Sequence, residues 1–189
     1  METLKSVLTR RSAPRLAAPA PGDHELLALL EAAMSAPDHG RLLPWRLVSL
    51  RGGERERLGR ELAARAGEDP EDRARAAAKP LRAPLLLAIV LSPVEHPKIP
   101  RWEQLAAATA VVSTLSLLLH DRGYASIWRT GPATEDSAVR ALHGLGAGEQ
   151  LLGWLYVGTA SGATPPRPRP DPARYLTALT GLGPQEAGE

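Results

Sequence analysis

A run of 15 uncharged residues, 105–119, constrains the fold more than any other part of this sequence. It contains neither proline nor glycine, so nothing in it interrupts a helix. On such a helix Leu105, Val112 and Leu119 fall on one face, and further apolar residues cover much of the opposite one. A helix that is apolar nearly all round is buried on all sides. We therefore predict a helix over 102–122, either in the middle of the domain or at a subunit interface.

A membrane-spanning helix is the alternative interpretation of this run. Fifteen residues rise only about 22 Å at ~1.5 Å per residue, whereas the hydrocarbon core of a bilayer is about 30 Å thick. The amino-terminal segment METLKSVLTRRS also lacks the continuous apolar stretch and cleavage site of a secretory signal. We therefore expect no membrane association and a cytoplasmic location.

The composition narrows the possible functions. A chain of 189 residues with no cysteine is expected to form one domain over 1–189, without a disulfide, a thiolate metal site or a cysteine nucleophile. The five histidines are scattered without ligand spacing, so we expect no metal site. The net charge is only +2 and the basic residues alternate with acidic ones, which argues against nucleic-acid binding.

Hydrophobic periodicity predicts several helices and four strands around one sheet. The predicted strands are Trp45–Leu50, Pro84–Leu91, Tyr124–Arg129 and Leu151–Val157, and the second is apolar throughout, as expected for a strand covered on both faces. The predicted helices are 2–10, 23–34, 54–66, a short one after Asp69, 102–122 and 134–143. Ala13–Pro21 is expected to be a linker, and about 161–189 an extended proline-rich tail. This order of elements favours an α+β or α/β fold.

No common nucleotide-binding, serine-hydrolase or zinc-protease motif occurs in the chain. Instead, three short segments stand out by their order and spacing. They are Arg10-Arg11-Ser12, Ala36-Pro37-Asp38-His39-Gly40 with Pro44-Trp45-Arg46, and the run from Gly123 to Gly131, GYASIWRTG. The run Lys98 to Gln104, KIPRWEQ, accompanies them.

Together these segments resemble the nitroreductase family of FMN-dependent oxidoreductases, and in particular its small-subunit branch. The resemblance spans roughly Leu4 to Thr159. It implies an α+β fold with three layers, in which helices flank a mixed, mainly antiparallel sheet and the long central helix is buried. It also implies an obligate homodimer with FMN sites at the subunit interface.

The resemblance implies a phosphate site at the end of the first helix. Arg10 and Ser12 match the family's phosphate-binding pair, a planar cation beside a hydroxyl. Arg11 belongs to the same segment, with its backbone placed near the flavin ring. A basic residue near the carboxyl terminus also contacts the phosphate in many members, and Arg167 or Arg169 is the candidate here. The alternative is that both arginines of the first pair are solvated charges at a helix end.

The resemblance also assigns contacts to the flavin ring. Trp128, Arg129 and Thr130 end a strand and are expected to approach the cofactor. Ser35 and His39 match positions that reach the flavin from the opposite subunit. The alternatives are that Trp128 is a core residue and that His39 is structural or solvated.

Two positions depart from the family pattern. Many members carry Asn and Gln in the turn before Pro-Trp, where this chain has Arg41 and Leu43. The polar contacts that those amides make to the flavin edge are therefore not expected from the same positions.

The implied activity is a two-step transfer of a hydride from NADH or NADPH through FMN to a nitroaromatic, quinone or similar acceptor. No side chain needs to act as a nucleophile, since the cofactor carries the chemistry. Trp102 is a candidate wall of the acceptor pocket. Two alternatives remain: another flavin reaction on the same fold, such as dehydrogenation, dehalogenation or flavin breakdown, and a non-enzymatic dimeric binding module.

Overall fold

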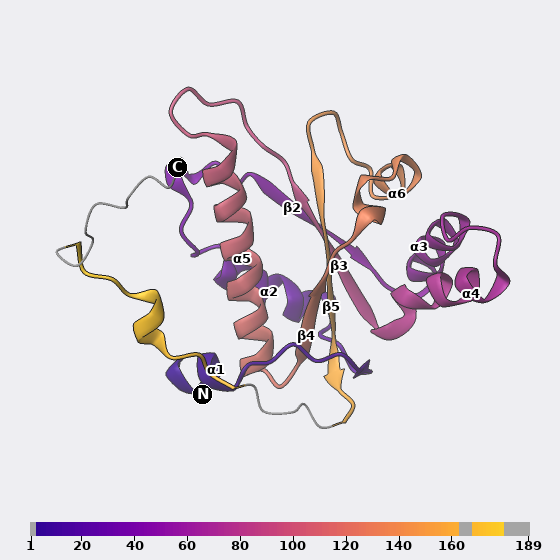
Figure 1. Ribbon diagram of the computed structural model, residues 1–189, viewed down its shortest axis with the longest axis horizontal. Helices are drawn as coiled ribbons and strands as arrows, with labels where there is room; N and C mark the ends of the chain where they lie inside the picture. Colours follow the sequence, from indigo (N-terminus) through magenta and orange to yellow (C-terminus); the bar gives the residue numbers. More distant parts are fainter. Residues whose placement is uncertain (1–2, 163–167, 180–189) are drawn as a thin grey trace, which may run out of the picture.

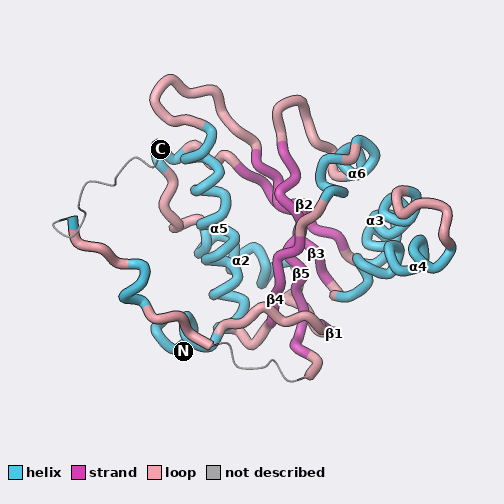
Figure 2. Tube along the Cα trace, viewed as in Figure 1, coloured by secondary structure: helices cyan, strands magenta, loops and turns pink. Residues whose placement is uncertain are grey.

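The computed structural model of the protein describes residues 3–162 and 168–179. A five-stranded sheet lies between two groups of helices (Figures 1 and 2). The strands are β1 (Leu16–Ala17), β2 (Trp45–Leu50), β3 (Leu85–Leu91), β4 (Ala125–Arg129) and β5 (Gln150–Ala160). The α-helices are α1 (Thr3–Thr9), α2 (Asp23–Ala33), α3 (Gly52–Ala64), α4 (Pro70–Ala78), α5 (Arg101–Asp121) and α6 (Ser137–Leu142). Short 3₁₀ turns are η1 (His39–Arg41), η2 (Lys79–Arg82), η3 (Pro132–Glu135) and η4 (Pro172–Tyr175).

The sheet is antiparallel in every strand pair. Its order is β1-β5-β3-β2, and β4 pairs with β5. Among the described residues the one parallel contact is an isolated bridge between Ser12 and Ser126. The mixed, mainly antiparallel sheet that we predicted is therefore confirmed.

Alternate residues of β3 and β5 enter two different hydrophobic clusters, one on each face of the sheet. One cluster packs against α2 and α5 and contains Leu85, Leu87, Ile89, Leu155 and Val157 from the strands. The other packs against α3 and α6 and contains Leu86, Ala88, Val90, Trp154 and Tyr156. Every residue of β3 is buried, as its continuous apolar run predicts. This arrangement confirms the three-layer α+β fold, and Figure 1 shows the helices on either side of the sheet.

Helix α5 is buried on one side only within this chain. Val111, Val112, Leu115 and Leu119 are covered by α2 and the sheet. On the other side Ala106 and Ser113 are exposed, and so is the Leu105 side chain. The prediction of burial on all sides is thus met only in part by the single chain.

By length and composition α5 passes a test for a membrane-spanning helix, with a mean hydropathy of 1.3 over its most apolar window. Within the described residues it is the only helix that passes. The side chains of its covered face pack into the domain core between α2 and the sheet. The core helix of a domain can have the same length and apolar composition, so these properties of α5 do not support a membrane-spanning role.

Two segments near the amino terminus differ from expectation. Within the expected linker Ala13–Pro21, Leu16 and Ala17 form β1 and pair with Ala160 and Thr159 of β5. The linker prediction is wrong there because the pairing depends on a partner more than a hundred residues away. In α1 the expected apolar stripe exists, but Leu4, Val7 and Leu8 remain exposed in this chain.

Candidate functional site

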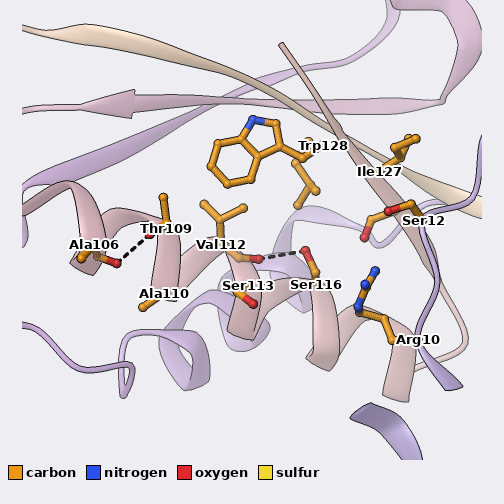
Figure 3. Close-up of a pocket in the computed structure, with 12 residues that line it drawn as sticks. Arg10, Ser12, Ala106, Thr109, Ala110, Val112, Ser113, Ser116, Ile127 and Trp128 are labelled. Carbon is orange, nitrogen blue, oxygen red and sulfur yellow. Dashed lines mark hydrogen bonds between the residues drawn. The ribbon is translucent and has the colours of Figure 1, made fainter. Parts of the chain in front are cut away.

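A pocket of about 510 Å³ lies between α5, β4 and the segment after α1. It is lined by Arg10, Ser12, Ala106, Thr109, Ala110, Val112, Ser113, Ser116, Ser126, Ile127, Trp128 and Leu155. Figure 3 shows Arg10 and Ser12 at one end of this pocket and the Trp128 indole toward the other. We call it the first pocket. It thus joins two of the three segments that the sequence singled out.

The cationic end of the first pocket is held in place by the backbone. The amide of Arg10 donates to the carbonyl of Ser6 at 2.9 Å, which continues the last turn of α1. Ser12 bridges to Ser126 of β4, and the next amide, that of Ala13, donates to the Ser126 carbonyl at 3.1 Å. Arginine and serine therefore leave the helix in fixed directions beside the pocket.

The local field at this end is positive. Burial lowers the pKa of His120, at the end of α5, and the charges of Arg10 and Arg11 lower it further, against an opposing effect of Asp121. Within the described residues no hydrogen bond or ion pair engages the Arg10 guanidinium. A cation without a counter-ion beside a serine hydroxyl suits an anionic group such as a phosphate.

A flat apolar wall forms the other end of the pocket. The Trp128 indole Nε1 donates to the carbonyl oxygen of Leu152 at 3.1 Å. Leu152 is the residue that the β3–β5 register passes over, between the pairs Ile89–Gly153 and Val90–Leu151. A β-bulge leaves one residue unpaired, so its carbonyl is free to take the indole. The wall is therefore fixed by a hydrogen bond as well as by packing.

A row of hydroxyl groups lies along α5 in the first pocket. The Thr109 hydroxyl donates to the carbonyl of Ala106 at 2.8 Å, and the Ser116 hydroxyl donates to the carbonyl of Val112 at 2.8 Å (Figure 3). Ser113 lies between them. Hydroxyls that donate to their own helix can still accept hydrogen bonds from a ligand. The helix therefore offers a polar strip to a bound molecule.

The side chain of Arg11 lies outside the first pocket. Its Nη1 donates to the carbonyls of Leu8 at 2.8 Å and Arg10 at 2.9 Å, so it satisfies the end of α1. Arg169 approaches the same Leu8 carbonyl at 3.4 Å, whereas Arg167 lies outside the described residues. The cofactor contacts predicted for these arginines stay predictions.

Ser35 and His39 do not line the first pocket of their own chain. The Ser35 hydroxyl donates to the carbonyl of Ala32 at 2.8 Å at the end of α2. The exposed His39 ring places Nδ1 at 2.6 Å from Glu103 Oε2, which ties η1 to the first turn of α5. Trp102, the candidate wall, is also exposed and outside the pocket. The contacts of Ser35 and His39 with a flavin held by the opposite subunit, and the place of Trp102 in the acceptor pocket, remain predictions.

Arg129 and Thr130 face a second pocket, on the opposite side of the sheet. Neighbouring strand residues point to opposite faces, and the register pairs Trp128 with Leu155 and Arg129 with Trp154. Trp128 therefore enters the first pocket, while Arg129 and Thr130 line a pocket that also contains Trp154. Flavin contacts of Arg129 and Thr130 stay a prediction.

The turn before Pro44-Trp45 shows why its departures from the family pattern matter. Arg41 and Leu43 have φ values of 53° and 47°, which is rare for residues other than glycine and asparagine. The Asp38 carboxylate accepts the amides of Leu42 at 3.3 Å and Leu43 at 2.8 Å and so holds the turn. An asparagine fits such a backbone more easily, so this chain keeps the turn at a higher local cost.

Sequence reasoning missed the hydroxyl row of α5 and the bulge beneath Trp128. Thr109, Ser113 and Ser116 interrupt an otherwise apolar helix at intervals of about one turn, which is a detectable signal of a polar strip. Gly153 inside an apolar strand is likewise a signal of a bulge or a close backbone approach.

Comparison with known proteins identifies the family of this chain. A family model described as the nitroreductase family matches residues 7–159. "Putative NAD(P)H nitroreductase YdjA" of Escherichia coli strain K12 is 37% identical over 181 residues, which cover 94% of this chain and 99% of that protein.

Solved structures share the fold. A nitroreductase-like family protein from Bacillus cereus superposes with a TM-score of 0.82 at 23% identity, covering 96% of this chain and 97% of that one. An FMN and NADPH-dependent nitroreductase, NfnB from Sphigopyxis sp. strain HMH, superposes with a TM-score of 0.75 at 23% identity, covering 95% and 99%. Most of the chain is matched by sequence and by fold, and it therefore belongs to the nitroreductase family.

Proposed function

We propose that the protein is an FMN-dependent oxidoreductase that moves two electrons from NADH or NADPH to a nitroaromatic, quinone or similar acceptor. The observation that carries this proposal is the first pocket, in which the cation and hydroxyl of Arg10 and Ser12 face a flat wall made by Trp128. The names of the related proteins, which specify NAD(P)H in one case and FMN and NADPH in another, support the cofactor and the reductant.

The residues of the first pocket fit the parts of FMN. The phosphate dianion needs a fixed cation and a hydroxyl donor, which Arg10 and Ser12 supply. The ribityl chain carries hydroxyls that match the strip formed by Thr109, Ser113 and Ser116. The isoalloxazine ring is flat and largely apolar, so the indole of Trp128 offers it a matching surface.

The division of labour follows from these residues. When bound, FMN would supply the redox chemistry that links a reduced nicotinamide to the acceptor. Arg10 and Ser12 anchor the anionic end, and Trp128 sets the plane of the wall. No nucleophilic residue is required, and we assign none.

We further propose that the working form is a homodimer in the cytoplasm, with each first pocket completed by the second subunit. The pocket lies against the uncovered side of α5, where Leu105, Ala106 and Ser113 are exposed. The apolar side chains of Leu4 and Val7 on α1 are exposed as well. A second copy of the chain would remove these surfaces from water, and it would bring Ser35 and His39 toward the flavin.

The visible spectrum of the purified protein tests the cofactor, and anaerobic mixing with NADH or NADPH tests the reaction. We expect a yellow protein whose flavin absorbance bleaches with one or both nucleotides and returns on addition of a quinone. Parallel lines in double-reciprocal plots against both substrates would support two separate half-reactions. A protein that neither contains nor binds FMN contradicts the proposal. Bound FMN that neither nucleotide reduces contradicts the reductase activity and favours another flavin reaction.

A further inference from the structure

The second pocket has a volume of about 510 Å³, and none of the residues that line it lines the first pocket. Its walls come from the end of α3, from η2 and η3, and from β4 and β5. It lies on the α3 side of the sheet, whereas the first pocket lies on the α5 side. A ligand here would therefore be separated from the first pocket by the sheet itself.

The lining of the second pocket is cationic. Arg65, Lys79, Arg82 and Arg129 contribute to it, and none of the described residues that line it is acidic. Arg65 is paired with Asp136 beside the pocket. Four positive side chains around one hollow, of which one is paired with a carboxylate, concentrate a positive potential that attracts anions.

Three of these cations lack a counter-ion. Within residues 3–162 and 168–179, the Lys79 ammonium and the Arg82 guanidinium make no hydrogen bond or ion pair. The Nε of Arg129 is buried and has no hydrogen-bond partner in the same part of the chain. Burial of a guanidinium nitrogen without an acceptor is costly. A bound anion would satisfy it.

The floor of the second pocket is aromatic. The guanidinium carbon of Arg129 lies 5.6 Å from the centroid of the Tyr156 ring, which holds the cation against the floor. Trp154 is fixed by a hydrogen bond of 3.0 Å from its Nε1 to His143 Nε2. Burial raises the pKa of Tyr156, against the opposing charges of Arg129 and Arg82, so its hydroxyl keeps its proton and can donate.

We propose that the second pocket binds a small phosphate monoester whose organic part is flat or apolar. Lys79, Arg82 and Arg129 meet the phosphate dianion, and Trp154 and Tyr156 contact the organic part. Three unpaired cations match a dianion with three acceptor oxygens better than a monovalent carboxylate. This proposal does not depend on the redox activity, because none of these five residues lines the first pocket.

Isothermal titration calorimetry with phenyl phosphate at fixed ionic strength tests the proposal on the full-length protein. The double variant K79Q/R82Q removes two exposed, unpaired charges of the pocket. The matched control R57Q/R60Q removes two charges from exposed positions of α3 that do not line it. The variant R10A removes the cation of the first pocket. Should the double variant fail to fold, R82Q alone carries the test.

We expect wild-type protein, R57Q/R60Q and R10A to bind phenyl phosphate with similar affinity. K79Q/R82Q should bind it at least about tenfold more weakly. Inorganic phosphate should bind the wild type about tenfold more weakly than phenyl phosphate, because it lacks the aromatic contact, and phenol alone should not bind.

Several results would overturn the proposal. The wild type could fail to bind phenyl phosphate, or K79Q/R82Q could retain full affinity, and either outcome removes the assigned site. Loss of binding in R10A alone would place the ligand in the first pocket. Equal affinity for inorganic and phenyl phosphate would remove the organic part of the assignment.

Discussion

The indole of Trp128 donates its hydrogen bond to the carbonyl of Leu152, the residue that the β3–β5 register passes over. The bulge in the β3–β5 pair thus orients the Trp128 side chain, which lies on the neighbouring strand β4 and lines the first pocket. The irregularity of β5 therefore has a structural role at the site.

Gly153→Ala should destabilise the protein and disturb the first pocket. Gly153 has a φ of +124°, and a Cβ there would lie 2.4 Å from the Arg129 carbonyl and 2.9 Å from Trp128 Nε1. We expect a loss of at least about 2 kcal/mol in the free energy of unfolding, measured by urea denaturation. Gly53→Ala is the control, since its Cβ would meet open space within α3. Equal stability of the two variants would contradict the prediction.

Arg10→Ala should weaken FMN binding with little change in fold. The Arg10 guanidinium lines the first pocket and contacts no described acceptor, so its removal costs the protein no internal hydrogen bond. Loss of a charge-assisted contact to phosphate is worth about 1.5–3 kcal/mol, which corresponds to roughly a tenfold or greater rise in Kd. Flavin fluorescence titration measures it. Arg15→Ala, an exposed arginine outside both pockets, should leave the Kd unchanged.

Ala106→Glu should separate the proposed dimer. Ala106 is exposed on the uncovered side of α5 and also lines the first pocket. In a dimer formed through this side, the carboxylate that the substitution introduces would be buried between the two subunits. We expect a monomer in sedimentation velocity experiments, together with weaker FMN binding. Ala74→Glu, on the exposed side of α4, is the matched control and should remain dimeric. A wild-type protein that sediments as a monomer while binding FMN would refute the shared site.

A mixed dimer of one Arg10→Ala subunit and one His39→Ala subunit tests the predicted reach of His39 across the interface. If each flavin site takes Arg10 from one chain and His39 from the other, the mixed dimer contains one intact site and one doubly altered site. We expect about half of the wild-type activity in tagged, co-purified mixed dimers. If both residues serve the same site within one chain, every site carries one change, and neither site recovers.

Acid should destabilise the fold through Glu149. Its carboxylate accepts from Arg46 Nε at 2.8 Å and Nη2 at 2.7 Å, and also from Ser92. The hydrogen bonds from Arg46, opposed by burial, lower the pKa of Glu149 from 4.5 to about 2. A depressed pKa stabilises the folded state above pH 4.5, and this contribution is lost as the pH falls toward 2.

The whole contribution is up to about 3 kcal/mol, and urea denaturation at pH values from 7 to 3 should record a loss of about 2 kcal/mol of it. Glu149→Gln should be less stable than the wild type at pH 7 and should lose less stability on acidification. Glu56→Gln, an exposed position on α3, should keep the wild-type pH dependence. An unchanged acid limb in the Glu149 variant would show that the ion pair contributes nothing.

Local patterns in the sequence were sufficient to predict those elements whose structure depends on burial alone. The apolar run of β3 predicted a strand covered on both faces, and each of its seven residues is buried. The resemblance to the nitroreductase family assigned Arg10, Ser12 and Trp128 to one cofactor site, and the first pocket contains all three. The strand depends on short-range periodicity and the site assignment on short segments whose residues and order match a family, and both are local features of a sequence.

Other features depend on contacts that no local window contains. β1 has only two residues and exists because Ala160 and Thr159 pair with it. The separation of Trp128 from Arg129 follows from the register against β5, which the sequence does not specify. The uncovered side of α5 shows the same limit, since its composition predicts burial without saying which molecule provides the cover.

Successive side chains of β4 point to opposite faces of the sheet, so this strand separates the first pocket from the second pocket, whose chemistry differs. Trp128 lines the first pocket, and the next residue in the chain, Arg129, lines the second pocket. A shift of the β4 register by a single residue would move each side chain to the opposite face of the sheet, so that Trp128 would face the second pocket and Arg129 the first. Insertions and deletions within Ala125–Arg129 should therefore be far less tolerated than those in the turn before β5. The length of β4 is constrained by both pockets, because any change in it alters both.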